Sequence, residues 1–127
     1  MTILDIVLVV KIIGTGLFCA LPFMFLPAAR LGPMLGVGDD AMPLARLYGG
    51  AVLALLVGYG FGFSGMTGGR FPWGVVTMGI VSNGVATLTM VLTGSVARAK
   101  GMAILIGSIT VALIFCALNP ALVTAPL

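Results

Sequence analysis

Four long stretches of the chain are almost entirely apolar, and short segments rich in glycine, proline or charge separate them. They cover residues 3–26, 44–66, 72–94 and 101–118. At about 1.5 Å of rise per residue, a helix of this length matches a hydrocarbon layer about 30 Å thick. Backbone polar groups cannot stay unpaired in lipid, so each stretch is predicted to be helical. The pattern predicts an all-α integral membrane four-helix bundle, with residues 1–127 forming a single transmembrane domain.

The connections between these stretches differ in length. Residues 27–43 read PAARLGPMLGVGDDAMP, which is too short and too broken by glycine and proline to cross the membrane. We expect this segment to be short helix or irregular chain lying in the membrane interface. Gly68 and Gly69 precede Pro72 and predict a tight turn, with the proline in the first turn of the next helix.

Composition supports the membrane assignment and excludes several classes of protein. Charged residues make up 7% of the chain and apolar residues 61%, whereas an ordinary soluble domain has about 25% charged residues. The net charge of +3 comes from scattered basic residues, so no basic stripe supports nucleic-acid binding. Membrane lipids are the predicted surroundings.

The basic residues predict an orientation in the membrane. The two connections that follow the first and third apolar stretches, with the helix ends beside them, carry four basic residues: Arg30, Arg46, Arg98 and Lys100. The positive-inside rule places these residues in the cytoplasm, near lipid head groups, and both termini outside a bacterial inner (plasma) membrane. Arg46 could anchor its helix end, bind a lipid phosphate, or pair with Asp39 or Asp40. Those two aspartates are expected to lie in a solvated loop.

Three polar residues fall inside the apolar stretches and are candidates for function: Lys11, Ser82 and Asn83. An ionisable residue inside a membrane helix is by default a functional hypothesis. The favoured alternative for Lys11 is that its long side chain extends to the interface, where Asp5 could help to neutralise it. Asn83 could either join two helices by a hydrogen bond or line a polar cavity.

The second apolar stretch carries small residues at every fourth position: Gly50, Ala54, Gly58 and Gly62. Small residues let helices approach closely, so this face is a candidate for packing against another helix of the chain or of a partner. Such spacing also arises readily by chance in a chain with 19 glycines. Tyr48, Tyr59 and Trp73 are expected to be interfacial or packing aromatics.

No catalytic residue or metal site is predicted, so the chain is not expected to be an enzyme. It contains no histidine and no glutamate, and its two cysteines, Cys19 and Cys116, lie in separate apolar stretches near opposite membrane faces. The cysteines are therefore expected to be buried packing residues rather than a disulfide pair. No cofactor is predicted. Contact with a lipid, quinone or pigment would need no side-chain metal ligand.

The layout resembles the DoxX-like group of small four-helix bacterial membrane proteins. The resemblance rests on the first apolar helix, the segment PAARLGPMLGVGDD, and the start of the second helix at Arg46–Gly50, RLYGG, continuing as AVLALLVG. Some members of that group are linked to quinone-dependent sulfur oxidation. The second helix here lacks the acidic residue found in many members, so the resemblance implies no catalytic residue.

These observations favour a non-catalytic accessory subunit that packs against a larger bacterial membrane complex, respiratory or photosynthetic. Its partners would be other transmembrane subunits or further copies of the chain. A small-molecule or ion transporter or channel is one alternative, and the membrane subunit of a quinone-linked oxidoreductase is another. A proton-coupled drug carrier of the small multidrug type is disfavoured, because its first helix needs a glutamate and this chain has Lys11 there.

Overall fold

The computed structural model describes residues 1–67 and 70–127, and the regular structure of these residues is helical. The elements are α1 (Ile3–Thr15), η1 (Gly16–Ala20), α2 (Leu21–Phe25), α3 (Ala28–Leu35), η2 (Asp39–Ala41), α4 (Met42–Thr67), α5 (Trp73–Leu92), η3 (Ser95–Ala97), α6 (Lys100–Leu118) and α7 (Pro120–Val123). One isolated β-bridge, between Thr2 and Pro126, joins the two ends of the chain.

Four helical spans are long and apolar enough to cross a membrane: Ile3–Phe25, Asp39–Ser64, Trp73–Leu92 and Lys100–Leu118. They match the four predicted stretches to within a few residues, apart from the earlier start of the second. The prediction of an all-α four-helix bundle is confirmed. The turn predicted at Gly68 and Gly69 lies outside the described residues.

The first span is a continuous helix, but one of its turns is not α-helical. Between α1 and α2, η1 forms a π-helical turn in which the Leu21 N–H donates to the Gly16 carbonyl, five residues earlier. Pro22 follows immediately, and its ring has no N–H to donate and would crowd the carbonyl four residues before it. The wider turn makes room for the proline without breaking the span, as π-helical turns do in other helices.

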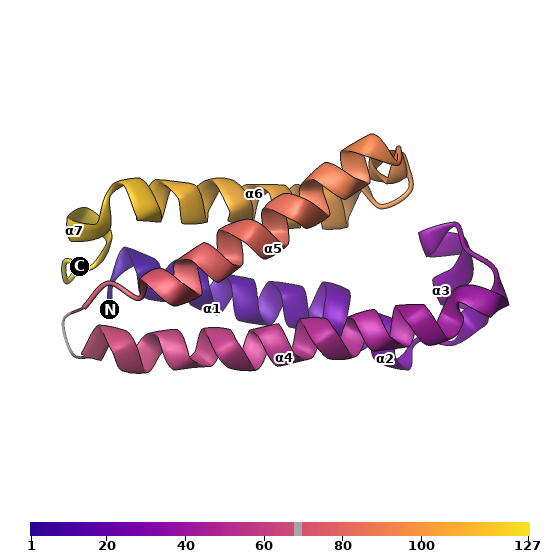
Figure 1. Ribbon diagram of the computed structural model, residues 1–127, viewed down its shortest axis with the longest axis horizontal. Coiled ribbons are helices and arrows are strands. Elements are labelled where there is room, and N and C mark those ends of the chain that lie inside the picture. The colour runs from indigo at the N-terminus through magenta and orange to yellow at the C-terminus, as the bar shows by residue number, and fades with distance from the viewer. Residues whose placement is uncertain (68–69) are drawn as a thin grey trace.

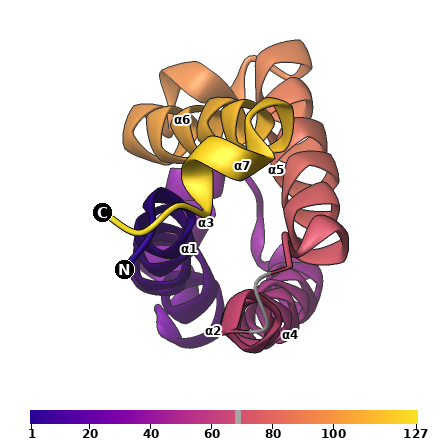
Figure 2. The same cartoon turned by 90° about the vertical axis from the view of Figure 1, so that its left-hand side faces the viewer.

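Seen along the long axis, the long helices stand in a ring in the order α1, α4, α5, α6 (Figure 2). The closest packing is between α5 and α6, and between α4 and the first span. Helix α5 starts beside α4 and crosses toward α6, so α4 and α5 diverge along their length (Figure 1). Both termini lie at the end where α5 starts, and α3 and η3 lie at the other end.

The connection 27–43 forms a short helix and a single turn before α4 begins at Met42, and it makes no fifth span. Helix α3 ends at Gly36, whose φ of 72° is a left-handed conformation that glycine adopts without strain. A Cβ at Gly36 would stand 3.0 Å from Arg98 Nε. Arg98 therefore lies against the end of α3 and links it to the α5–α6 connection.

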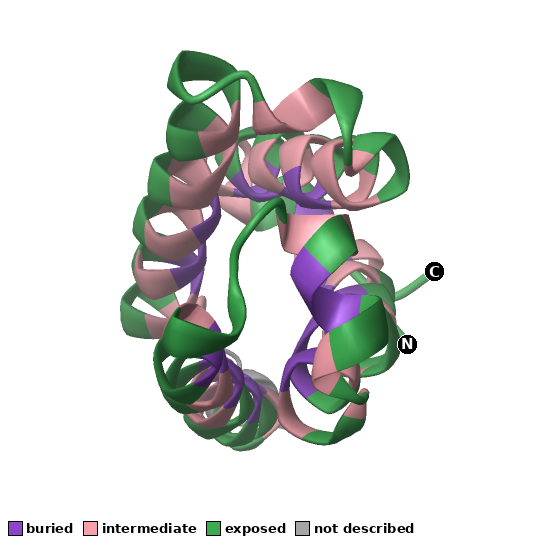
Figure 3. Cartoon of the chain, turned by 90° about the vertical axis from the view of Figure 1, so that its right-hand side faces the viewer, coloured by how far each residue is buried: buried purple, intermediate pink, exposed green. Residues whose placement is uncertain are grey.

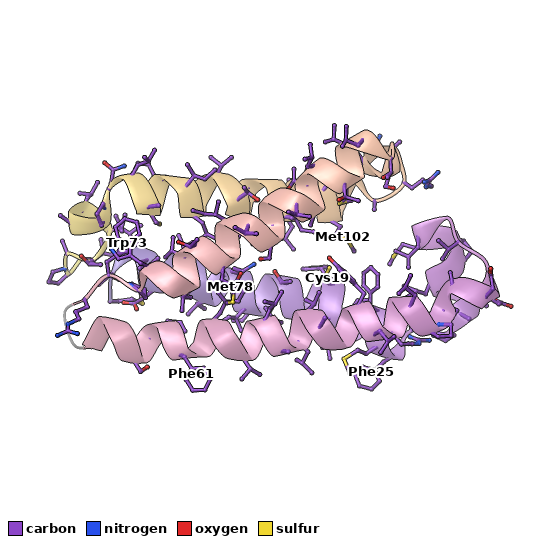
Figure 4. All side chains as sticks on the ribbon, in the orientation of Figure 1. Cys19, Phe25, Phe61, Trp73, Met78 and Met102 are labelled. Atoms are coloured by element: carbon purple, nitrogen blue, oxygen red, sulfur yellow. The ribbon has the colours of Figure 1, made fainter. Side chains whose placement is uncertain are left out.

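Apolar side chains cover both faces of the helices. Buried residues face the interior of the ring, while the outward faces are exposed (Figure 3). Phe25 and Phe61, which are 71% and 70% exposed, point away from the bundle (Figure 4). An apolar outer surface of this kind is what a lipid environment requires.

Candidate functional site

The ammonium of Lys11 lies inside the bundle. The residue is 2% exposed, and its Nζ donates a hydrogen bond of 3.0 Å to Asn83 Oδ1 on α5. The expectation that Lys11 extends to the membrane interface is wrong, because the side chain reaches across the bundle instead. This bond joins the first and third spans through two residues that the sequence singled out separately.

Tyr59 of α4 completes the surroundings of this ammonium. Lys11 Nζ stands 4.4 Å from the centroid of the Tyr59 ring, within the range of a cation–π interaction. The Tyr59 hydroxyl lies 3.1 Å from Ser82 Oγ. Tyr59 is fully buried, so of the two roles expected for it, packing is confirmed and an interfacial position is excluded. The three polar candidates therefore form one cluster that draws on three of the four spans.

Gly79, also on α5, holds two side chains of the cluster through its backbone carbonyl. Its carbonyl accepts a 2.7 Å bond from Asn83 Nδ2 and a 3.3 Å bond from Ser82 Oγ. A Cβ at this position would stand 2.5 Å from Leu113 Cδ1 and 3.2 Å from the Tyr59 ring. Glycine thus lets α5 approach α4 and α6 closely, and its carbonyl orients the amide that receives the Lys11 ammonium.

One buried polar group at the site has no partner among the described residues. Thr15 lies one turn beyond Lys11 on α1 and is 6% exposed, and its Oγ1 makes no hydrogen bond within the described part of the chain. Lys11 and Thr15 both line a small cavity of about 30 Å³, together with Cys19. At about 10–15 Å³ per water-sized atom, this cavity has room for about two such atoms.

A much larger apolar cavity adjoins the small one. It measures about 510 Å³ and lies where α4 and α5 diverge, with α3 at its far end. The two cavities share four lining residues: Tyr48, Ser82, Ala86 and Ile106. The wall of the larger cavity includes Val81 and Val85 of α5, which are exposed. The cavity therefore opens sideways, at the surface that lipid would cover. Its volume falls in the range of about 300–1,000 Å³ typical of small-molecule sites.

All three acidic residues lie away from this cluster. Asp5 closes a capping box at the start of α1, where its carboxylate accepts from the Thr2 N–H at 2.6 Å. Asp5 thus caps its own helix rather than neutralising Lys11. Asp39 and Asp40 are exposed in η2, which confirms the solvated loop. The chain has no further carboxylate side chain to balance the Lys11 charge.

Arg46 binds backbone carbonyls, a contact that the sequence did not predict. Its guanidinium donates to the carbonyl of Phe23 at 2.8 Å and to that of Leu26 at 2.5 Å. These carbonyls belong to the last turn of the first span, where a helix leaves acceptors without partners. Arg46 therefore caps α2 and ties the start of α4 to the end of the first span.

The other three basic residues expected near lipid head groups lie at the surface of the bundle. Arg30, Arg98 and Lys100 are exposed, and the elements that carry them lie at the α3 end of the bundle (Figure 1). They remain available to lipid head groups.

The small-residue face of α4 does not pack as one groove within the chain. A Cβ at Gly62 would lie 3.1 Å from side chains of both α1 and α5, and one at Gly58 would touch Met78 at 3.4 Å. A Cβ at Gly50 would meet nothing within 4 Å, and Ala54 is exposed. Only the half nearer the termini serves internal packing, while the other half faces outward.

The two cysteines are free and buried, as expected. Cys19 lies 3.8 Å from the sulfur of Met102, at the start of α6 (Figure 4). Cys116 lies near the opposite end of that same helix.

Sequence reasoning missed Thr15, Tyr59 and Gly79 as parts of the site. Two signals were present. Thr15 follows Lys11 by four residues, and Gly79 precedes Ser82 and Asn83 by three and four residues, spacings that share one face of a helix. Nothing local to α4 marked Tyr59, whose role depends on how the helices are arranged.

No protein-family model, curated protein or solved structure matches this chain. The resemblance to the DoxX-like group stays a prediction, and the site has to be interpreted from its own geometry.

Proposed function

We propose that this chain is a non-catalytic, small-molecule-binding membrane protein, which receives a lipophilic ligand with an oxygen-bearing head group from the bilayer. Of the functions that the sequence left open, this one is nearest to the small-molecule transporter, because a transporter must first bind its substrate. The observation that carries the proposal is the buried Lys11 ammonium, held by Asn83 beside the small cavity that adjoins the 510 Å³ apolar one.

The arrangement matches the usual chemistry of such sites. Ligand pockets are mostly apolar, with a few fixed polar groups that orient the ligand. Here the apolar wall is large, and the polar groups gather at its inner end around Lys11 and Ser82. A cluster that served only to join helices would need no cavity beside it.

The route into the site follows from where the cavity opens. Val81 and Val85 lie on its wall and are exposed on the lipid-facing side. A lipophilic molecule dissolved in the bilayer could therefore enter between α4 and α5 without crossing water. Its apolar part would lie against α5 and α6, and its head group would reach Ser82 and Lys11.

The test uses a photoreactive dodecanol carrying a diazirine, added to the protein in phosphatidylcholine nanodiscs. After illumination, mass spectrometry of the digested protein locates the adducts. We expect adducts on the cavity wall, at Met90 and Met102. Ala86→Phe, which would fill the point where the two cavities meet, should reduce that labelling strongly. Ala51→Phe on the exposed face of α4 is the matched control and should leave it unchanged.

Adducts spread evenly over lipid-facing residues, with no loss in Ala86→Phe, would show that the probe samples only the bilayer. That result would contradict the proposed function.

An accessory role is a second candidate, favoured by the outward half of the small-residue face. Gly50 and Ala54 leave a shallow, unfilled strip on α4 where a helix of a larger membrane complex, or of a second copy, could approach closely. Gly50→Leu should weaken co-purification with such a partner in mild detergent. Gly62→Leu should instead lower the stability of the chain itself, because Gly62 already contacts α1 and α5. Unchanged co-purification in Gly50→Leu would contradict the accessory role.

A further inference from the structure

The charge at the site is not balanced within the chain. Lys11 carries three N–H donors, of which one is used on Asn83. A cation in the apolar interior is costly unless it is paired, and the three acidic side chains lie at the helix end or in the exposed loop. The Tyr59 ring stabilises the charge but does not neutralise it. An anion brought in by a ligand would supply the missing partner.

A second observation, independent of the charge, points to the same place. Thr15 Oγ1 is a buried hydroxyl with no partner among the described residues. A buried donor without an acceptor lowers stability, so such a group calls for an explanation. Thr15 lines the same small cavity as Lys11. An acceptor placed there could receive hydrogen bonds from both side chains.

The size of the small cavity limits what that acceptor can be. At about 30 Å³ it accommodates about two water-sized atoms, which suits the two oxygens of a carboxylate. A phosphate or sulfate head group, with more oxygens around a tetrahedral centre, is too large. An amine would place a second positive charge beside Lys11, and an alcohol would leave the charge unbalanced.

We infer that the ligand is a single-chain amphiphile with a carboxylate head group. Its two oxygens occupy the small cavity, where they accept from Lys11 Nζ and Thr15 Oγ1, and its hydrocarbon chain lies in the 510 Å³ apolar cavity. This inference rests on the proposed function and names the ligand class of that same site.

The test is competition against the photoreactive dodecanol in phosphatidylcholine nanodiscs, at neutral pH. The competitors share one chain length and differ in the head group: dodecanoate, dodecanol, dodecylamine and dodecyl phosphate. Because hydrogen bonds between charged groups are stronger than those to a neutral hydroxyl, dodecanoate should compete at about tenfold lower concentration than dodecanol. Dodecylamine and dodecyl phosphate should compete less well than dodecanol.

Two variants separate recognition at the site from partition into the bilayer. Lys11→Met with Asn83→Leu removes the charge together with its partner and leaves no unpaired amide. In it the preference for dodecanoate over dodecanol should disappear, because the charge that distinguishes the two head groups is gone. Thr15→Val removes the hydroxyl at constant shape and should reduce the preference severalfold.

The outcomes distinguish this inference from the proposed function. Equal competition by dodecanoate and dodecanol, or by dodecyl phosphate and dodecanoate, would overturn the carboxylate assignment and leave the binding function standing. A preference for dodecanoate that survives unchanged in the Lys11→Met/Asn83→Leu variant would also overturn it. If the dodecanol probe labels no cavity residue in the wild-type protein, the proposed function and this inference both fall.

Discussion

Lys11 Nζ and Asn83 Oδ1 lie 3.0 Å apart, although 72 positions of sequence separate the two residues. Each alone is an unfavourable group in a membrane helix: one is a cation and the other an amide. Together with the Tyr59 ring they form a contact between the first and third spans that apolar packing alone would not specify. The bond fixes how α1 and α5 are rotated toward the interior, because both side chains must face it.

The stability of this contact can be measured with a double-mutant cycle. Lys11→Met leaves the Asn83 amide oxygen unpaired, whereas Lys11→Met with Asn83→Leu replaces both groups by apolar ones. We expect a coupling energy of about 0.6–2 kcal/mol, the range for hydrogen bonds between membrane helices. Unfolding in mixed detergent micelles, followed by circular dichroism, measures it. Additive effects of the two single variants would mean that the bond contributes nothing to the fold.

Gly79 is predicted to tolerate an added side chain poorly. A Cβ there would stand 2.5 Å from Leu113 Cδ1, and overpacking of this kind typically lowers stability by about 1–3 kcal/mol. Gly79→Ala should therefore lower the unfolding midpoint, while Gly50→Ala, which meets open space, should not. Adding Leu113→Ala to Gly79→Ala should give a smaller loss than the sum of the two separate losses. A midpoint for Gly79→Ala equal to that of Gly50→Ala would refute the close approach of α5.

Arg46 should matter more to stability than other basic residues at its end of the bundle. Arg46→Met would leave the carbonyls of Phe23 and Leu26 without their charged donor, at a loss of about 1–3 kcal/mol. Arg30→Met is the control, since Arg30 is exposed on α3 and surface changes usually stay within about 0.5 kcal/mol. The comparison uses the same unfolding assay, and an Arg46→Met midpoint within error of the Arg30→Met midpoint would argue against the cap.

The orientation in the membrane is open to a labelling test. With Cys19 and Cys116 replaced by alanine, single cysteines are introduced as Leu127→Cys and Arg98→Cys, at opposite ends of the bundle. The four basic residues at the α3 end predict that this end is cytoplasmic. A membrane-impermeant maleimide should then label position 127 in intact cells and label position 98 only after the cells are opened. Labelling of position 98 in intact cells would reverse the assignment.

The four spans could be predicted from the sequence because length and hydropathy alone define them. The site could be predicted only as separate residues. In a soluble protein, polar residues mark the outer face of each helix, so the sequence shows which way a helix faces. In a membrane the lipid side is as apolar as the interior, and so Leu8, which is buried, and Val9, which is exposed, look alike.

Lys11 is a second case in which the sequence does not show where a side chain points. Its sequence position fits both a side chain that reaches the interface and one that reaches across the bundle. What decides between them is Asn83 on α5 and the ring of Tyr59 on α4, and their placement depends on the order of helices around the ring. Pro22 was a local signal for the π-helical turn before it, but a proline in a membrane span has several structural solutions.

That π-helical turn predicts where the first span tolerates a change of length. An α-helix turns by about 100° per residue, so a deletion in a regular helix rotates everything beyond it, but η1 accommodates one residue more than an ordinary turn would. Losing a single residue between Gly16 and Ala20 would let the span become a regular α-helix while α2 keeps its orientation. Phe23, edge-on to Tyr48 with ring centroids 5.4 Å apart, would then keep its partner, and Arg46 would keep the carbonyls that it binds. A deletion in this segment should therefore be better tolerated than one elsewhere in the first span, and homologous sequences that differ in length there should differ between Gly16 and Ala20.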